Sequence, residues 1–245
     1  MIRALWVALV GSITTVVLSS HIVLAEWFGW ARTLERICWT HPRWWARSLL
    51  WASGVTVELV GVERLFGDSP KVMVANHESW FDVLALAAWL PVEYRFVAKK
   101  ELEKVPFWGK AWLACGHISV DRRNHQAALG ALERAQSSSH GQGITLVVFP
   151  EGTRSPDGAM LPFKKGAFVL AIQLAAPVIP AAVLGSRRVM SKNSWKIRSG
   201  TIRIVFGDPI HVDGLVYRDR DRLAQESRRA VAALRGGEGP TEPNR

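Results

Sequence analysis

The sequence has few cysteines and few acidic residues for its length. Its 245 residues include two cysteines, Cys38 and Cys115, and neither lies in a C-x-x-C pair. We therefore expect no disulfide framework and no zinc site, and we place the catalytic part in the reducing cytosol. Lys and Arg (31) outnumber Asp and Glu (21), which gives a formal net charge of +10. A chain this basic favours an anionic partner: nucleic acid, an anionic bilayer or a phosphorylated substrate.

Internal repeats and metal-binding motifs are also missing. His77-Glu78 begins like the zinc motif HExxH, but Phe81 stands where the second His is required. With 49% hydrophobic and 21% charged residues, the chain suits a globular protein with an added apolar segment. Only the tail at 236–245, made of Gly, Pro and polar residues, is expected to be disordered.

An uncharged apolar stretch opens the chain. Residues 4–25 contain no Asp, Glu, Lys or Arg, and a helix of that length would cross a hydrocarbon core of roughly 30 Å. We expect a retained membrane helix. The alternative is a cleaved signal peptide, since residues 23–25 resemble a cleavage site, although the apolar run is longer than such peptides usually have.

Basic residues follow this stretch. Arg32, Arg36, Arg43 and Arg47 come after it and Arg3 precedes it, so the positive-inside rule places the next domain on the cytoplasmic side of the inner membrane. Residues 27–54 are rich in Trp and Arg, as an interfacial helix would be. Residues 1–54 are thus predicted to be membrane-associated, as one crossing or as a helical hairpin.

The rest of the chain alternates short β-branched runs with helical patterns. The strand candidates are 55–65, 71–75, 94–99, 118–121, 144–149, 178–184 and 201–206, and the helix candidates are 81–90, 107–114, 126–137, 166–175 and 219–234. This alternation predicts an α/β catalytic domain over 55–235, with a central, mostly parallel sheet flanked by helices.

The first group of chemically capable residues is Asn76-His77-Glu78-Ser79-Trp80-Phe81-Asp82. It follows a buried strand candidate and precedes a helix, a common place for catalytic groups in α/β folds. His77 and Asp82 are too far around one helix to share a face, so they meet only if His77 lies on the turn. Asp82 would then fix the tautomer of His77 and leave it as a base. Read alone, the pair also fits an ordinary turn histidine and a helix-start carboxylate.

The second group is Phe149-Pro150-Glu151-Gly152-Thr153-Arg154-Ser155, after another buried strand candidate. Gly152 allows close backbone approach, and Arg154 offers a planar fork for a phosphate. Glu151 could accept bonds from a substrate hydroxyl, from Arg154 or from backbone amides. An ordinary surface turn with a Glu–Arg pair is the plainer interpretation. Lys164 and Lys165 add positive charge at a helix start.

Together these segments resemble the lysophosphatidate acyltransferase family, the 1-acylglycerol-3-phosphate O-acyltransferases. Residues 76–82 match its NHxxxxD motif, and residues 149–155 match its FPEGTRS motif without substitution. Residues 98–122 contain segments similar to its second block, and 178–183 are similar to its fourth. The four blocks occur in order, and the resemblance implies the glycerolipid acyltransferase fold.

The resemblance also implies roles. His77 would deprotonate the acceptor hydroxyl, Asp82 would orient His77, and the oxygen would attack an acyl thioester without an acyl-enzyme. The residues implied in substrate binding are Arg122 and Arg154 for the phosphate, Glu151, Gly152 and Thr153 in the loop, Pro180 as an apolar wall, and Lys100 for the donor or the membrane. The partners implied are the bilayer, lysophosphatidate, and acyl-CoA or acyl-carrier protein as co-substrate, with no metal, bound cofactor or nucleic acid.

Three alternatives stay open. The acceptor could be another lyso-lipid, such as a lysophospholipid or a lyso-ornithine lipid. Catalysis could instead be covalent, through Cys115. The chain could also be a non-catalytic protein that binds anionic lipid or nucleic acid, which would account for the positive charge but not for the His77–Asp82 turn.

Overall fold

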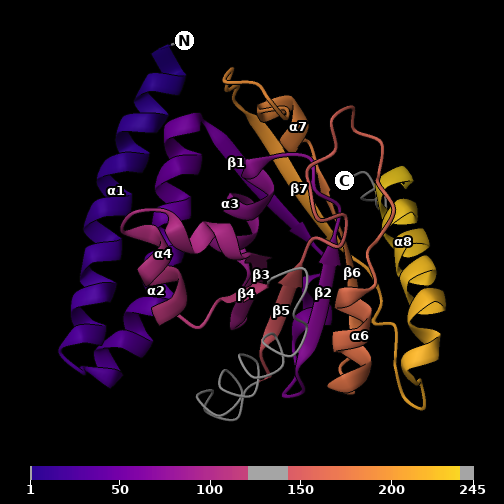
Figure 1. The fold of residues 1–245 in the computed structure, drawn as a ribbon. Coiled ribbons are helices and arrows are strands. Elements are labelled where there is room, and N and C mark those ends of the chain that lie inside the picture. The colour runs from indigo at the N-terminus through magenta and orange to yellow at the C-terminus, as the bar shows by residue number, and fades with distance from the viewer. Residues whose placement is uncertain (1, 121–142, 238–245) are drawn as a thin grey trace, which may run out of the picture.

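The computed structural model describes residues 2–120 and 143–237 (Figure 1). The α-helices are α1 (Ile2–Trp27), α2 (Ala31–Ser53), α3 (Trp80–Trp89), α4 (Trp108–Ala114), α6 (Gly166–Gln173), α7 (Ser186–Val189) and α8 (Arg220–Gly236). The strands are β1 (Val55–Val60), β2 (Lys71–Ala75), β3 (Tyr94–Lys99), β4 (Ile118–Val120), β5 (Thr145–Val148), β6 (Val178–Leu184) and β7 (Gly200–Phe206). Three short 3-10 helices join them: η1 (Val62–Leu65), η2 (Lys100–Lys104) and η3 (Tyr217–Asp219).

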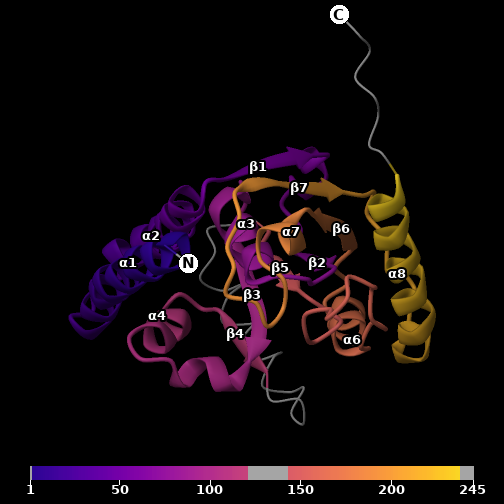
Figure 2. The same cartoon turned by 90° about the horizontal axis from the view of Figure 1, so that it is seen from above.

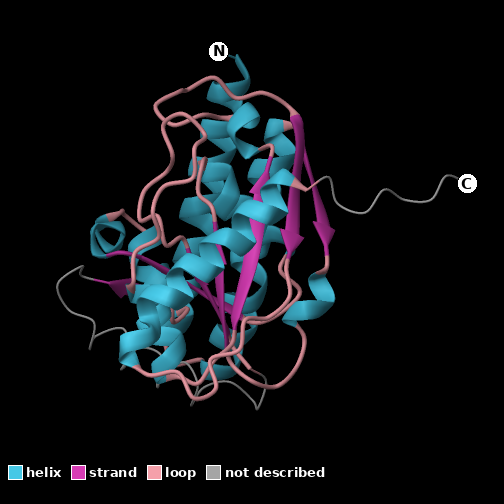
Figure 3. Cartoon of the chain, turned by 90° about the vertical axis from the view of Figure 1, so that its right-hand side faces the viewer, coloured by secondary structure: helices cyan, strands magenta, loops and turns pink. Residues whose placement is uncertain are grey.

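The strands form one seven-stranded sheet in the order β1-β7-β6-β2-β5-β3-β4. Its pairs are parallel except for β6 and β7, which run antiparallel. Figure 2 shows the sheet curving around α3, with α1, α2 and α4 towards its open side. Helices α6 and α8 cover the outer face, and α8 lies across the strands in Figure 3. This arrangement confirms the expected α/β class with a mostly parallel sheet.

The middle of the sheet is buried on both faces, which explains its uninterrupted apolar runs. Every residue of β2 is buried between β5 and β6. Met73 and Ala75 face the core around α3, whereas Val72 and Val74 face the core beneath α6 and α8. The strand is therefore held from both sides up to its last residue, directly before the turn that carries His77.

Most element boundaries agree with the sequence predictions within two residues. The exception is the first strand, predicted over 55–65, which ends at Val60. Gly61 adopts a left-handed φ of +76°, which an extended strand does not have, so the chain leaves the sheet there and turns into η1. The predicted helix at 126–137 and most of the predicted disordered tail lie outside the described residues.

Helices α1 and α2 form a hairpin that packs on the α/β domain. Helix α1 contacts α2 and α4, and α2 contacts α3. Arg43 of α2 donates to the carbonyls of Leu90 (3.1 Å) and Val92 (2.9 Å), just after α3. By length and composition α1 could cross a membrane, and most of its apolar stretch is not buried within the protein. The geometry is thus that of a hairpin lying along the domain.

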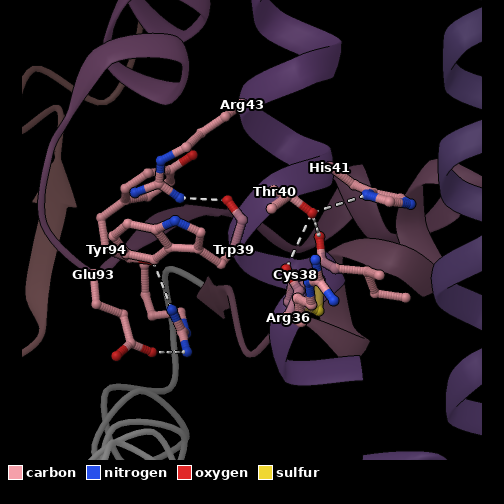
Figure 4. The surroundings of a disulfide bond; sticks show 11 residues. Arg36, Cys38, Trp39, Thr40, His41, Arg43, Glu93 and Tyr94 are labelled. Atoms are coloured by element: carbon pink, nitrogen blue, oxygen red, sulfur yellow. Dashed lines mark hydrogen bonds and ion pairs between the residues drawn. A yellow bond between two sulfur atoms is a disulfide. The ribbon is translucent and has the colours of Figure 1, made fainter. Parts of the chain in front are cut away.

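A disulfide joins Cys38 of α2 to Cys115 at the end of α4 (Figure 4). The prediction that the two cysteines would not pair was wrong, because residues 77 apart in sequence are brought together where the hairpin packs against α4. The cysteine count therefore gives no support for a reducing compartment. The alternative of covalent catalysis through Cys115 also loses its nucleophile, since its sulfur is bonded to that of Cys38.

We predict that the double variant Cys38→Ala/Cys115→Ala loses about 2–4 kcal/mol of unfolding free energy, because a long closed loop no longer restricts the unfolded chain. Denaturant unfolding in detergent, with and without reductant, measures this. Reductant should destabilise the unsubstituted protein and leave the double variant unchanged. Thiol labelling of the denatured, non-reduced protein at both cysteines would contradict the bond.

Candidate active site

The turn between β2 and α3 builds its geometry from local hydrogen bonds. Ser79 is the N-cap of α3, and its hydroxyl accepts from the backbone N–H of Phe81 at 3.2 Å. Asp82, at the third helical position, accepts from the backbone N–H of Ser79 at 2.8 Å. This reciprocal capping box fixes how the chain enters the helix. It also places the Asp82 carboxylate back over the turn, towards His77.

Asp82 and His77 meet as predicted. The imidazole Nδ1 lies 2.8 Å from Asp82 Oδ2, and the same oxygen accepts from the backbone N–H of Glu78 at 2.7 Å. The Asp82 side chain has no solvent exposure, whereas that of His77 is 14% exposed. With Nδ1–H donated to the carboxylate, Nε2 carries the lone pair. The pair is therefore arranged as a general base with its orienting group.

Two groups after β5 hold the histidine from behind. The ring of Phe149 stacks on that of His77, with centroids 4.1 Å apart and planes 20° apart. Glu151 is 2% exposed, and its two oxygens accept from the backbone N–H groups of His77 and Leu161, each at 2.8 Å. Burial raises the pKa of Glu151, and these two amide bonds oppose that rise. Of the options that the sequence left open for Glu151, the structure shows bonds to backbone amides.

The loop over 150–158 lies directly against this turn. The backbone N–H of Ser155 donates to the carbonyl of His77 at 2.7 Å. Gly152 adopts φ +70°, a left-handed backbone conformation that favours glycine. The Arg154 guanidinium lies 5.1 Å from the centre of the Trp80 ring, in cation–π range. Burial lowers the pKa of Arg154, which remains a cation at neutral pH.

The other predicted site residues lie in different surroundings. Thr153 is exposed in the same loop, 3.4 Å from Nζ of Lys192. Lys100 is exposed at the start of η2, after the end of β3. Pro180 is buried within β6 beside Val74, with its ring towards Gly207. Arg122 lies outside the described residues.

Several supporting residues were not singled out from the sequence. Asn76 continues the pairing of β2 with β6 through its amide, which donates to the carbonyl of Val183 (2.9 Å) and accepts from its N–H (2.8 Å). Arg235 of α8 donates to Glu78 at 2.6 Å and to the carbonyl of Gly158 at 2.8 Å. Lys192 donates to the carbonyl of Arg154 at 2.7 Å. The Ser79-x-x-Asp82 spacing could have indicated the capping box, whereas Lys192 and Arg235 carry no local signal.

Burial raises the pKa of Glu78, and the neighbouring Arg235 limits that rise. Asp82 adds to it, and Arg187 and Asn76 oppose it. Within residues 2–120 and 143–237, no cluster of three or more His, Cys, Asp or Glu side chains has the placement of a metal site.

Comparison with known proteins places this geometry in a family. The family model described as Acyltransferase matches residues 56–184, which include both the His77–Asp82 turn and the Arg154 loop. The chain belongs to the Acyltransferase family. Its sequence is similar to the 1-acyl-sn-glycerol-3-phosphate acyltransferase alpha of Homo sapiens, with 34% identity over 74% of this chain and 64% of the human protein. The 1-acyl-sn-glycerol-3-phosphate acyltransferase of Cocos nucifera is 29% identical over 82% of this chain and 64% of the coconut protein.

The fold has a solved counterpart. The crystal structure of the 1-acyl-sn-glycerophosphate (LPA) acyltransferase PlsC from Thermotoga maritima superposes with a TM-score of 0.78, at 22% identity, over 96% of each chain. This Acyltransferase-family chain therefore shares the PlsC fold along nearly its whole length. It spans less than two thirds of the length of the two curated relatives, 64% in both cases.

We predict that Glu151→Gln destabilises this Acyltransferase-family protein by about 1–3 kcal/mol, because an amide can accept with only one end and leaves a buried N–H unpaired. The loss should be larger at pH 5 than at pH 7, because the amide of Gln does not titrate. The pKa of Glu151 is raised on folding, so stability from its protonated form is present at acid pH and disappears as pH rises. Denaturant unfolding at pH 5 and pH 7 tests this. Asp157→Asn, an exposed carboxylate of the same loop, is the matched control. Equal stability of both variants would contradict the assignment.

Proposed function

We propose that the protein transfers a fatty acyl group from acyl-CoA or acyl-carrier protein to the sn-2 hydroxyl of 1-acylglycerol-3-phosphate, giving phosphatidate. The observation that carries the proposal is the buried His77–Asp82 pair at 2.8 Å, hydrogen-bonded to the loop that presents Arg154. The names of the curated relatives support this choice of acceptor.

In the proposed reaction His77 acts as a general base. Its Nε2 takes the proton of the acceptor hydroxyl while that oxygen attacks the thioester carbonyl carbon. The C–O bond forms and the C–S bond breaks, and the imidazolium returns the proton to the leaving thiolate. Asp82 stabilises the imidazolium through Nδ1, with Oδ2 at 2.8 Å. Each step uses groups of the protein and of its two substrates, with no bound cofactor.

The acceptor phosphate is assigned to Arg154. Its guanidinium can bind a phosphate through two parallel hydrogen bonds, and the Trp80 ring beneath it limits its freedom. The backbone N–H of Ser155, next to Arg154, donates to the carbonyl of His77. This bond fixes the position of the phosphate-binding loop relative to the base. Arg122, Thr153 and Lys100 remain candidates for further contacts with the substrates.

The bilayer is proposed to hold both the enzyme and its acceptor. Large apolar side chains on α1 are exposed, among them Leu5, Leu9, Ile13 and Val17. Such a surface suits insertion of the hairpin into one leaflet. The Arg residues after α1 favour the cytoplasmic face of the inner membrane. A lyso-lipid could then reach Arg154 without leaving the membrane.

We predict that His77→Ala lowers turnover about 10²–10⁴-fold, the contribution of a positioned base, while the fold is retained. The measurement is thiol release from acyl-CoA that depends on added lyso-lipid. His211→Ala, which alters a histidine with a 75% exposed side chain, is the control and should keep full activity. Full thiol release by His77→Ala would contradict the mechanism. If the unsubstituted protein released no thiol with any donor and acceptor, the enzyme assignment would be contradicted.

We predict that Arg154→Gln raises the KM for lysophosphatidate by about 10–100-fold, as expected for losing a charged, bidentate hydrogen bond. Steady-state kinetics with lysophosphatidate, lysophosphatidylcholine, lysophosphatidylethanolamine and a lyso-ornithine lipid test both the residue and the acceptor. Arg229→Gln, on the exposed side of α8, serves as the control. A preference of the unsubstituted enzyme for an acceptor without a phosphate monoester would refute lysophosphatidate as the substrate.

A further inference from the structure

The loop over 190–199, between α7 and β7, presents a large aromatic side chain to solvent. Trp195 is 89% exposed, more than any other large apolar side chain in residues 2–120 and 143–237. The indole has an apolar body and one N–H donor, a combination suited to the boundary between lipid and water. Its exposure therefore makes Trp195 a candidate for contact with a second surface.

The loop is held in place by hydrogen bonds of its own. The N–H of Arg198 donates to the carbonyl of Val189 at 2.9 Å, and that of Ser194 donates to the carbonyl of Ser191 at 3.2 Å. The Ser194 hydroxyl in turn accepts from the N–H of Lys196 at 3.1 Å. The outward position of Trp195 is thus part of an ordered turn.

The start of the loop is attached to the candidate site at two places. At its start, the Ser79 hydroxyl of the catalytic turn donates to the carbonyl of Met190 at 2.6 Å. Lys192 donates to the carbonyl of Arg154 at 2.7 Å. A surface that bound this loop would therefore lie next to the group proposed to hold the acceptor phosphate.

The charged residues on either side of Trp195 in sequence have one sign. No Asp or Glu occurs between Asp157 and Asp208. The basic residues on and beside the loop are Arg187, Arg188, Lys192, Lys196 and Arg198. Lys196 and Arg198, on either side of Trp195 in sequence, are both exposed. This combination favours a surface that is negatively charged outside and apolar just beneath.

The loop also continues the aromatic end of the hairpin. The N–H of Gly200 donates to the carbonyl of Gly54 at 3.3 Å, which joins the end of the loop to the end of α2. There Trp6 and Trp51 form an edge-to-face pair with centroids 6.2 Å apart, and both are exposed. Figure 1 shows this loop, the start of α1 and the end of α2 at the same upper end of the molecule.

We propose that residues 190–199 form a second contact with an anionic phospholipid bilayer, beside the catalytic turn and separate from the apolar side of the hairpin. Trp195 enters the interface, and Lys196 and Arg198 bind lipid phosphates. An acidic carrier protein would account for the cations, but it would leave unexplained the exposed Trp195 and its continuity with Trp6 and Trp51. The inference rests on the proposed function only in that the acceptor is a lipid.

A fluorophore at position 195 tests the contact in the full chain. Both natural cysteines are in the disulfide, so Trp195→Cys supplies one reactive thiol for an environment-sensitive dye. Asp213→Cys is the matched control, because Asp213 is exposed on the segment between β7 and α8. Phosphatidylglycerol-containing vesicles should shift the emission of the dye at 195 to the blue, and lipids with quenchers in their chains should dim it. The dye at 213 should not respond.

Kinetics test the charges separately. Lys196→Gln/Arg198→Gln should raise the apparent KM for an acceptor presented in anionic vesicles by about fivefold for each charge removed. The same variant should keep the KM for acceptor dispersed in detergent. Arg218→Gln/Arg229→Gln removes two exposed charges elsewhere and should change neither value.

Three results would overturn the proposal. One is an unchanged emission of the dye at position 195 when the protein has bound vesicles through its hairpin. Another is an equal response to neutral and anionic vesicles, and the third is a response to acidic carrier protein instead of lipid. Turnover in detergent reports on the proposed function independently, so loss of that function would be recognised as a different failure.

Discussion

The active site depends on one carboxylate oxygen that takes three donors. Asp82 Oδ2 accepts from Nδ1 of His77 and from the backbone N–H groups of Glu78 and Ser79, at 2.7–2.8 Å. The hydrogen bonds from the two backbone amides hold the carboxylate in place independently of the imidazole. His77 is therefore oriented by a group whose own position is fixed. The same bonds start α3. The residue that holds the His77 ring is therefore also the one that shapes the chain around it, and its side chain is fully buried.

The sheet makes this turn rigid by ending beneath it. Asn76 extends the pairing of β2 with β6 through the hydrogen bonds of its side-chain amide. Glu151, after β5, accepts a hydrogen bond from the backbone N–H of His77. Parallel strands place their carboxyl ends at one edge, so two segments 74 residues apart along the chain meet there. The phosphate-binding candidate Arg154 shares that support through Ser155. His77 and Arg154 thus depend on the same three central strands, β2, β5 and β6.

Much of the fold and of the candidate site was predictable from sequence, and the features that the predictions missed have physical reasons. β-branched runs located β2, β5 and β6 because strands buried on both faces need little else, and the turn residues after β2 and β5 marked the site. The end of β1 was missed because Gly61 takes a left-handed conformation close beside Phe206, the last residue of a strand that comes far later. The Cys38–Cys115 bond depends on how the hairpin packs on α4, which no local pattern encodes. Lys192 and Arg235 were missed for the same reason.

The disulfide and the hairpin together constrain how this protein can lie on a membrane. A single crossing by α1 alone would require the helix to leave its contacts with α2 and α4. The Cys38–Cys115 bond fixes α2 to α4, and Arg43 binds α2 to the end of α3, so the hairpin cannot move far from the domain. In the proposed membrane-bound state, the exposed apolar side of α1 would enter lipid along the flank of the folded domain. That geometry favours a hairpin held in one leaflet, with the catalytic turn carried along at a fixed position.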